Sequence, residues 1–323
     1  VYRAVLTDHL RVLGPDHPYT LGIRHNLATA LQGAGRVEEA IKSFQAVLTD
    51  RLRVLGPDHP GTLMTRRCLA AALHDTGQVE EAIESFQEVL TDCLRVLGPD
   101  HPDTLATRHG LVMALRAAGQ VGEAVKANRA VLTDCLRVLG PDHPDTLAIR
   151  RSLAGALQDT GQVGEAIGVY RAVLTDHLRV LGPDHPDTLT TRHNRAVALQ
   201  GAGRVEEAIK DFQAVLTDRL RVLGPDHPNT LLTRDNLVEV LSAAGRFDEA
   251  ASVYQSIVEA WLLSADSDDP DVLDARDDLA WALGRAECFD EALADYLKLI
   301  ADYERVMGVD DPDTLTARNN YIC

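Results

Sequence analysis

The nine-residue segment LRVLGPDHP recurs every 42 residues, and this period constrains the fold more than any other feature of the sequence. Its copies begin at Leu10, Leu52, Leu94, Leu136, Leu178 and Leu220, and the frame continues more loosely through Trp261 and Tyr303. A period of this length is typical of arrays in which each repeat packs only on its neighbours. We therefore predict a single array over 1–323, with a partial repeat at 1–8, seven full units over 9–302 and a partial unit at 303–323.

The chain opens inside a repeat. Its first 18 residues, VYRAVLTDHLRVLGPDHP, are found again from Val169 to Pro186. We therefore expect the sequence to begin in the middle of a helix and to be a piece of a longer array or of a larger protein. Cys323 falls where another helix should follow. Both ends are then expected to expose apolar stripes, which would favour end-to-end self-association.

Each unit contains the signals for two helices. In the unit at 60–97, Pro60 follows Asp58 and His59, a typical helix start, and Gly77 marks the end of the first helix. The second helix is predicted from its amphipathic spacing, with apolar residues at Ala82, Ile83, Phe86, Val89, Leu90, Leu94 and Leu97. No strand-like alternation is present. One such hairpin cannot bury both of its apolar faces, so the units must stack.

The unit also carries a family pattern: large-x2-Leu-small-x2-large, followed by Ala-x3-aromatic. It is met by Arg24, Leu27, Ala28, Leu31, Ala40 and Phe44, by Leu69, Ala70, Leu73, Ala82 and Phe86, and by Leu237, Val238, Leu241, Ala250 and Tyr254. This pattern resembles tetratricopeptide repeats, and the longer unit with LGPDHP-x-T and NLA is similar to the repeats of kinesin light chains and their bacterial relatives. No heptad run is visible, so binding of a motor chain is not expected.

The resemblance implies an all-α, right-handed superhelical solenoid of antiparallel helix pairs. It also implies a non-enzymatic protein–protein interaction scaffold that binds a peptide segment in its concave groove, which the first helix of each unit would line. The peptide-groove candidates on that helix are His25, Asn26, Arg67, His74, His109, Arg116, Arg151, His193, Asn194, Asp235, Asn236 and Asp277. In kinesin light chains an Asn at one of these positions contacts the peptide backbone. Asn26, Asn194, Asn236 and Asn320 match it, whereas Cys68, Gly110, Ser152 and Asp278 depart from it.

The charge of these candidates changes along the array, from basic or neutral in the first five units to acidic afterwards. Arg67, Arg116 and Arg151 predict that the groove holds an acidic peptide or a terminal carboxylate, because arginine binds carboxylates through paired hydrogen bonds. The histidines would add positive charge as the pH falls toward about 6. The alternative is that these side chains face water and only balance nearby carboxylates such as Asp75 and Asp159.

Two other residue types recur in most units and are interpreted as structural. Arginines at Arg24, Arg66, Arg108, Arg150, Arg192, Arg234, Arg276 and Arg318 are expected to pair with a repeat carboxylate such as Asp50 or Asp92. Histidines of the DHP segments, at His17, His59, His101, His143, His185 and His227, are too far apart to share a zinc ion. We therefore assign them to capping and turn packing.

Composition narrows the function classes further. A formal net charge of −17 argues against nucleic-acid binding and against adhesion to anionic membranes. Phosphate-binding loops, dinucleotide fingerprints and nucleophile elbows are missing, so neither a cofactor nor an enzymatic activity is predicted. Five cysteines without a C-x-x-C pair fit a cytoplasmic protein. The shortage of lysine relative to arginine, together with much Ala, Gly and Asp, suggests a bacterial source.

The last full unit differs in kind. Residues 261–302 contain ten Asp and two Glu against three basic residues, a net of nine negative charges, and both tryptophans, Trp261 and Trp281. Terminal repeats are commonly atypical because one face meets water, so we interpret this unit as a cap. The alternative is a separate acidic docking surface. Two other functions stay open: a sensor fragment of a larger bacterial signalling ATPase or effector, and a self-associating structural module.

Overall fold

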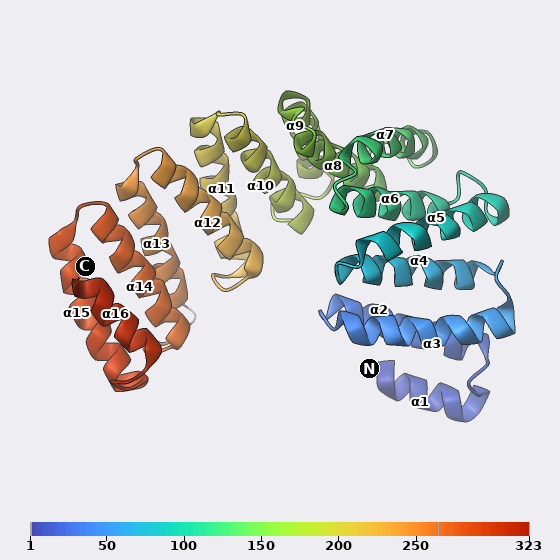
Figure 1. Cartoon of the computed structure of the whole chain (residues 1–323), viewed down its shortest axis with the longest axis horizontal. Coiled ribbons are helices and arrows are strands. Elements are labelled where there is room, and N and C mark those ends of the chain that lie inside the picture. Colours follow the sequence, from blue (N-terminus) through green and yellow to red (C-terminus); the bar gives the residue numbers. More distant parts are fainter. Residues whose placement is uncertain (1, 264, 323) are drawn as a thin grey trace. The chain divides into compact units, whose positions relative to one another are not determined.

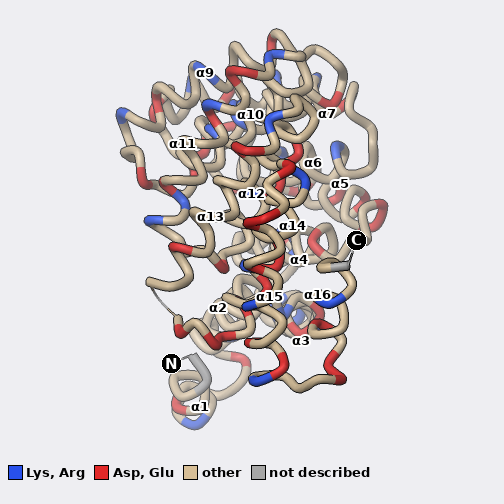
Figure 2. The backbone as a smooth tube through the Cα atoms, turned by 90° about the vertical axis from the view of Figure 1, so that its left-hand side faces the viewer, with Lys and Arg blue, Asp and Glu red and all other residues tan. Residues whose placement is uncertain are grey.

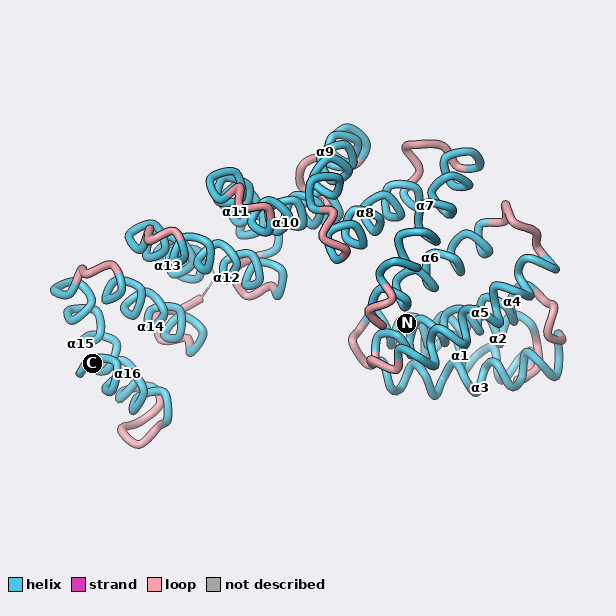
Figure 3. The backbone as a smooth tube through the Cα atoms, turned by 45° about the horizontal axis from the view of Figure 1, so that its top comes forward, coloured by secondary structure: helices cyan, strands magenta, loops and turns pink. Residues whose placement is uncertain are grey.

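The computed structural model describes residues 2–263 and 265–322, which form sixteen α-helices and no strand (Figure 3). The predicted all-α class and the antiparallel helix pairs are confirmed. The first helices are α2 (Pro18–Gly33), α4 (Pro60–Asp75), α6 (Pro102–Ala117), α8 (Pro144–Asp159), α10 (Pro186–Gly201), α12 (Pro228–Ala243), α14 (Pro270–Arg285) and α16 (Pro312–Ile322). The second helices are α1 (Tyr2–Leu13), α3 (Val37–Leu55), α5 (Val79–Val96), α7 (Val121–Val138), α9 (Val163–Val180), α11 (Val205–Leu223), α13 (Phe247–Leu262) and α15 (Phe289–Val306). Val1 and Cys323 lie outside the described residues, so the expectations placed on them stay predictions.

Histidine begins the first helices, as the structural interpretation of the DHP segments predicts. His59 is the N-cap of α4, and its Nδ1 atom accepts a hydrogen bond from the backbone N–H of Gly61 at 3.0 Å. The same bond recurs at the start of α2, α6, α8, α10 and α12. Asp269 takes the role at α14. Each cap satisfies a donor that the first turn of a helix would leave without a partner, and the following proline already has the helical φ.

A residue with positive φ separates the first helix from the second in most units. Gly77 has a φ of 78°, which a residue without Cβ adopts freely. Glu287 stands at the equivalent place between α14 and α15 and has a φ of 62°, the one positive φ recorded for a non-glycine residue within 2–263 and 265–322. The last full unit therefore keeps the same turn between its two helices, but with a glutamate where glycine adopts a positive φ more easily.

The core of each pair is completed by a residue from the next first helix. Phe44 and Phe86 of the second helices are buried, and each packs near the residue 24 positions later in the chain, Cys68 or Gly110. Where that aromatic is replaced by Asn128, the amide lies 3.0 Å from the hydroxyl of Ser152, also 24 positions later. The two positions therefore form a pair in which one residue limits the space of the other.

The recurring arginines pair across the helices of one unit, as predicted. Arg66 donates to Asp92 at 2.5 Å. The same pairing, 26 positions apart, joins Arg24 to Asp50, Arg108 to Asp134, Arg192 to Asp218 and Arg276 to Asp302. In α12 the expected partner is replaced by Ala260, and Arg234 instead contacts Asp235 at 2.8 Å and Asp278 at 3.5 Å. These partly buried pairs link the two helices of a unit.

The repeats are grouped into two larger compact units, Val1–Glu165 and Ala166–Cys323, with the boundary within α9. From here on, the first unit and the second unit are these two larger parts of the chain. In the first unit the helices stack in chain order (Figure 1), and α2, α4, α6 and α8 pack directly on one another, more extensively than the second helices α3, α5 and α7 do. The first helices therefore lie on the shorter, inner side of this stack. We call the surface formed by α2, α4, α6 and α8 the inner face of the first unit.

Candidate functional site

Two of the three arginines that predict an acidic ligand, Arg67 and Arg116, have acidic partners. Arg116 donates a hydrogen bond from Nε and a longer one from Nη2 to the carboxylate of Asp159, the second at 3.3 Å. Gly155 leaves room for this pair, because a Cβ there would lie 2.6 Å from Arg116 Nη1. Arg67 Nη2 lies 3.6 Å from Asp103 Oδ1. For Arg116 these contacts support the alternative in which a basic residue balances Asp159.

The remaining candidates of the first unit differ in exposure. Asn26 is exposed. His74 is half-buried, with Nδ1 3.3 Å from Asp75 Oδ1. Arg151 is half-buried, and its charge contributes to lowering the pKa of the neighbouring His109 imidazole. The groove candidates of the first unit therefore include few side chains that are both charged and open to a ligand.

Two of the candidate histidines are buried. His25 Nδ1 lies 3.4 Å from Thr65 Oγ1, which also accepts a hydrogen bond from the buried Arg51 at 2.5 Å. In the second unit His193 Nδ1 lies 3.2 Å from Thr233 Oγ1, which is bonded in the same way by Arg219. Both histidines pack against an aromatic ring of the second helix that follows them, Phe44 of α3 or Phe212 of α11.

The expectation that these histidines gain charge near pH 6 is wrong. Burial lowers the pKa of His25 and of His193 to about 4, and the charges of Arg51 and Arg219 add to the effect. Burial also lowers the pKa of His109. A neutral imidazole is favoured because a buried cation would lose its hydration. His25, His109 and His193 therefore add no positive charge to the surface at neutral pH.

The other candidates of the second unit lie on α10, α12 and α14. Asn236 Nδ2 lies 3.4 Å from His193 Nε2, and Asn194 is half-buried. Asp235 is exposed and accepts a hydrogen bond from Arg234. Asp277 is half-buried in α14, where acidic positions are concentrated (Figure 2), and burial raises the pKa of its carboxyl to about 6. Asp278 and Asp274 add to this shift by repulsion.

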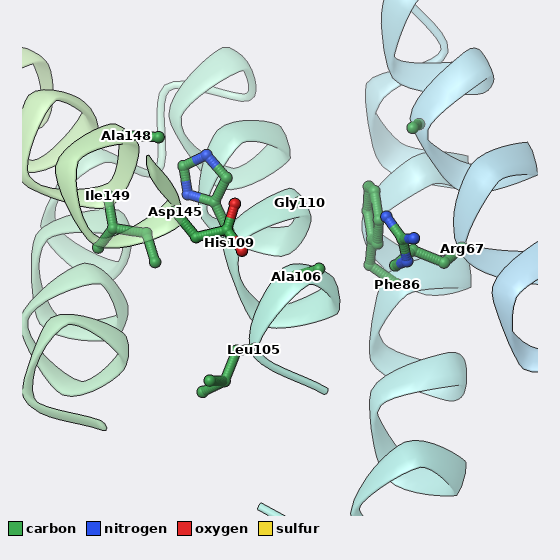
Figure 4. A pocket seen from close by; sticks show the side chains of 10 residues that line it. Arg67, Phe86, Leu105, Ala106, His109, Gly110, Asp145, Ala148 and Ile149 are labelled. Atoms are coloured by element: carbon green, nitrogen blue, oxygen red, sulfur yellow. The ribbon is translucent and has the colours of Figure 1, made fainter. Parts of the chain in front are cut away.

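A cavity of about 220 Å³ opens on the inner face of the first unit between α4, α6 and α8. In Figure 4, Arg67 and Phe86 lie on one side of it, and His109, Asp145 and Ile149 lie on the other. The full lining consists of Arg67, Ala71, Phe86, Leu105, Ala106, His109, Gly110, Asp145, Ala148 and Ile149. Of the predicted groove residues, the structure brings Arg67 and His109 together here.

The charged side chains that line this cavity are one of each sign. Arg67 and Asp145 carry opposite charges, and His109 is neutral at neutral pH because burial lowers its pKa. Arg67 Nε and His109 Nδ1 are buried without a hydrogen-bond partner among the described residues. No group of three or more His, Cys, Asp or Glu side chains that could hold a metal ion is found within 2–263 and 265–322. The cavity therefore offers mainly apolar walls with a neutral balance of charge.

Sequence reasoning missed most of the cavity. Phe86 and Leu105 lie on core positions of their helices, and Asp145 was not among the groove candidates. The available signal was Gly110, which departs from the Asn found at the equivalent positions 26, 194 and 236. A glycine at a position where the other units have larger residues indicates either a close packing contact or an opening. At Gly110 the structure has both, the contact with Phe86 and the cavity.

Comparison with known families decides the assignment. Profiles of the tetratricopeptide repeat match residues 19–91, 64–133, 149–213, 187–262 and 272–313, which together cover most of the chain. The chain belongs to the tetratricopeptide repeat family. The predicted resemblance is thereby confirmed. No curated protein matches this tetratricopeptide repeat chain significantly.

Several solved structures share the fold. The nearly identical TPR-like repeats assigned to a kinesin light chain of Podosopora anserina are 29% identical, with a TM-score of 0.52 over 64% of this chain and 97% of that one. BtubC (BKLC) from P. vanneervenii is 18% identical, with a TM-score of 0.59 over 70% of this chain and 91% of that one. The quorum sensor NprR from B. thuringiensis is 12% identical, with a TM-score of 0.57 over 99% and 91%. The similarity to kinesin light chain repeats is therefore also confirmed.

Tetratricopeptide repeats are typically non-catalytic scaffolds. The family supports a protein-interaction scaffold in general for this chain. None of the helices among the described residues is long and apolar enough to cross a membrane. The bacterial source, the cytoplasmic location, the single-domain organisation and the role as a sensor fragment stay predictions from the sequence.

Proposed function

We propose that this chain binds an extended peptide segment of a partner protein on the inner face of its first unit, across α4, α6 and α8. The cavity of about 220 Å³ beside Gly110 carries the proposal, because it is a concave site on the face formed by the first helices. Ligand sites in proteins are usually concave, mostly apolar and marked by a few polar groups. The ten lining residues fit that description.

Proteins with the same fold support this class of activity. A Rap protein complexed with competence and sporulation factor is 11% identical to this chain, with a TM-score of 0.59 over 89% of this chain and 75% of that one. The similarity extends to the fold alone. It supports ligand binding by a protein of this fold, and the choice of ligand here has to come from this chain's own residues.

An acidic peptide, the ligand expected from the basic residues, is one version of this proposal. Arg67 favours it, because its closest recorded carboxylate contact, to Asp103, is 3.6 Å long and leaves the guanidinium able to bind a second anion. Arg116 does not favour it, because its hydrogen bonds to Asp159 already use the guanidinium. A substitution of Arg67 therefore tests for an acidic ligand, and the same substitution of Arg116 serves as its control.

The binding proposal can be tested with peptides selected from a random phage-displayed library against the whole chain. Affinities of the selected peptides would be measured by calorimetry for the wild type and for Ala148→Trp, which blocks the inner face. Ala130→Trp, on an exposed position of the second helix α7, is the matched control. We expect Ala148→Trp to abolish binding and Ala130→Trp to leave it unchanged. Peptides that bind both variants equally would place the site elsewhere.

Acidity is tested with the same peptides after each acidic residue is replaced by its amide. If the ligand is acidic, Arg67→Ala should weaken binding of the acidic peptide about tenfold and of the amide peptide little, since a charge-assisted hydrogen bond contributes about 1.5–3 kcal/mol. Arg116→Ala should not distinguish the two peptides. Equal binding of both peptides by the wild type would exclude the acidic version and leave peptide binding intact.

Self-association is a second candidate, favoured by exposed apolar side chains in the second unit. Trp281, Phe289, Leu293 and Leu297 are 42–60% exposed, and the first three line a cavity of about 470 Å³. Exposed apolar patches commonly mark protein contacts. In sedimentation velocity, the apparent mass of the wild type should rise with concentration. The double variant Phe289→Ser/Leu293→Ser should keep the monomer mass at every concentration. A constant monomer mass in the wild type would exclude it.

A further inference from the structure

We propose that the cavity beside Gly110 receives one uncharged aromatic or large aliphatic side chain of the bound peptide, and that Gly110 is the residue that determines this selection. The inference rests on the proposed peptide binding and adds the chemical class of the residue that anchors the peptide. It differs from the acidic ligand expected from the arginines, because the anchor enters between apolar walls.

The shape of the cavity follows from the pair formed by Phe86 and Gly110. A Cβ on Gly110 would lie 2.6 Å from Phe86 Cζ, closer than real Cβ atoms approach another carbon. The ring therefore uses the space that a side chain at 110 would need, and it becomes a wall of the cavity. Ala71, Ala106 and Ala148 keep the surrounding first helices free of bulky groups.

The chemistry of the walls favours an uncharged apolar group. Phe86, Leu105 and Ile149 surround the space with ring and branched aliphatic carbon. An apolar cavity of about 150 Å³ is known to bind benzene, so a cavity of about 220 Å³ suits one ring or one large aliphatic side chain. Because Arg67 and Asp145 are opposite in charge, an ion of either sign would meet one repelling group here and would lose its hydration on entry.

Other units show what fills the corresponding space. At the positions equivalent to Phe86 and Gly110 a later unit has Phe212 and Asn236, and the Asn236 amide lies 3.4 Å from His193 Nε2. Beside Asn128 the chain has Ser152, whose hydroxyl lies 3.0 Å from the amide. In both places a side chain stands where Gly110 has none, which is why we assign the selection to this residue.

The test uses capped single amino acids as probes, so it does not depend on finding the natural partner. The chain would be labelled at alanine methyl groups and titrated with N-acetyl-phenylalanine amide, N-acetyl-leucine amide and N-acetyl-glutamate amide, followed by methyl NMR. We expect the Phe and Leu probes to shift the signals of Ala71, Ala106 and Ala148, and the Glu probe to leave them in place. Equal shifts with the Glu probe, or no shift with Phe and Leu, would overturn the proposal.

Two variants fill the cavity from different sides. Gly110→Asn gives positions 86 and 110 the residue types that Phe212 and Asn236 have together, so the pair has a precedent in the same chain. Ala106→Leu fills the cavity without touching the buried pair and serves where Gly110→Asn perturbs folding. Gly122→Ala, on α7 with no atom within 4 Å of the added Cβ, is the control. The Phe-probe shifts should disappear in both filling variants and persist in the control; their persistence in the filling variants would contradict the inference.

Library peptides separate this inference from the binding proposal itself. If peptide binding and the anchor are both correct, replacing the anchoring residue by Gly should lower affinity about tenfold to a hundredfold, in line with burial of one apolar side chain. Peptides that are blocked by Ala148→Trp but unaffected by Gly110→Asn would refute the anchor and keep the proposed function. Probe binding without binding of any peptide would refute the proposed function alone.

Discussion

The ring of Phe86 occupies the place where a side chain at residue 110 would begin, since a Cβ on Gly110 would lie 2.6 Å from Phe86 Cζ. Phe86 belongs to α5 and Gly110 to the following first helix α6, so the contact joins two successive units of the array. A residue that departs from the repeat pattern in one helix has thus changed both the packing of its neighbour and the shape of the inner face.

Gly110→Ala is expected to destabilise the chain even though alanine is the better helix former. Overpacking costs about 1–3 kcal/mol, against a gain of about 1 kcal/mol in helix propensity. Gly168→Ala, inside α9 with nothing within 4 Å of the added Cβ, should be stabilising by about 0.5–1 kcal/mol. Urea midpoints of the two variants should therefore move in opposite directions. A shift of both to higher urea would mean that Phe86 moves aside without cost.

Glu287→Gly is expected to stabilise the second unit. Glu287 has a φ of 62° at the turn between α14 and α15, where most units have glycine. A left-handed conformation costs a residue with Cβ about 1–2 kcal/mol, and the greater freedom of glycine in the unfolded chain offsets part of the gain. We expect a net gain of about 0.5–1 kcal/mol by urea denaturation. The reverse change, Gly245→Ala, should destabilise; a stabilising effect there would contradict this explanation.

The buried histidines should make stability depend on pH in a defined direction. The pKa of His193 is lowered from 6.5 to about 4, so the unfolded chain binds a proton more readily than the folded chain. The stabilisation is fully present above about pH 6.5 and is lost as the pH falls toward about 4, by up to about 3 kcal/mol. His193→Gln should remove this part of the pH dependence in urea titrations. An unchanged slope between pH 6.5 and 4 in the variant would show that His193 does not titrate as expected.

Asp277 should act in the opposite sense. Its carboxyl pKa is raised from 3.8 to about 6 by burial, so ionisation at neutral pH weakens the fold and protonation strengthens it as the pH falls through about 6 toward 3.8. Asp277→Asn should therefore stabilise the chain by about 1–2 kcal/mol at about pH 7.5, with screening by solvent considered, and by almost nothing at about pH 4. Asp235→Asn, at an exposed site bonded to Arg234, should not stabilise at either pH.

The sequence predicted the elements of the site more reliably than the exposure of its side chains. It placed His25, Arg67 and His109 on first helices, and it assigned the DHP histidines and Arg66 to capping and pairing. It could not show that His25 is buried against Phe44, because a helix period of 3.6 residues leaves the side chains at the edge of the buried stripe undecided. Burial lowers the pKa of His25 and so disfavours the positive charge that the sequence interpretation assigns to it.

The sequence by itself determined the repeat, the helix pairs and the family, because a period of 42 residues, helix caps and apolar spacing are local signals that neighbouring units reinforce. The tertiary structure decided which side chains are exposed and where the inner face is hollowed. In the sequence, Gly110 is only a position without a side chain. It lines a cavity because α5 brings the ring of Phe86 against α6 at this position. Arg116 likewise pairs with Asp159 because α8 brings this carboxylate to it. Such contacts between residues far apart in the chain depend on how the helices stack. The residue pattern within one repeat does not predict them.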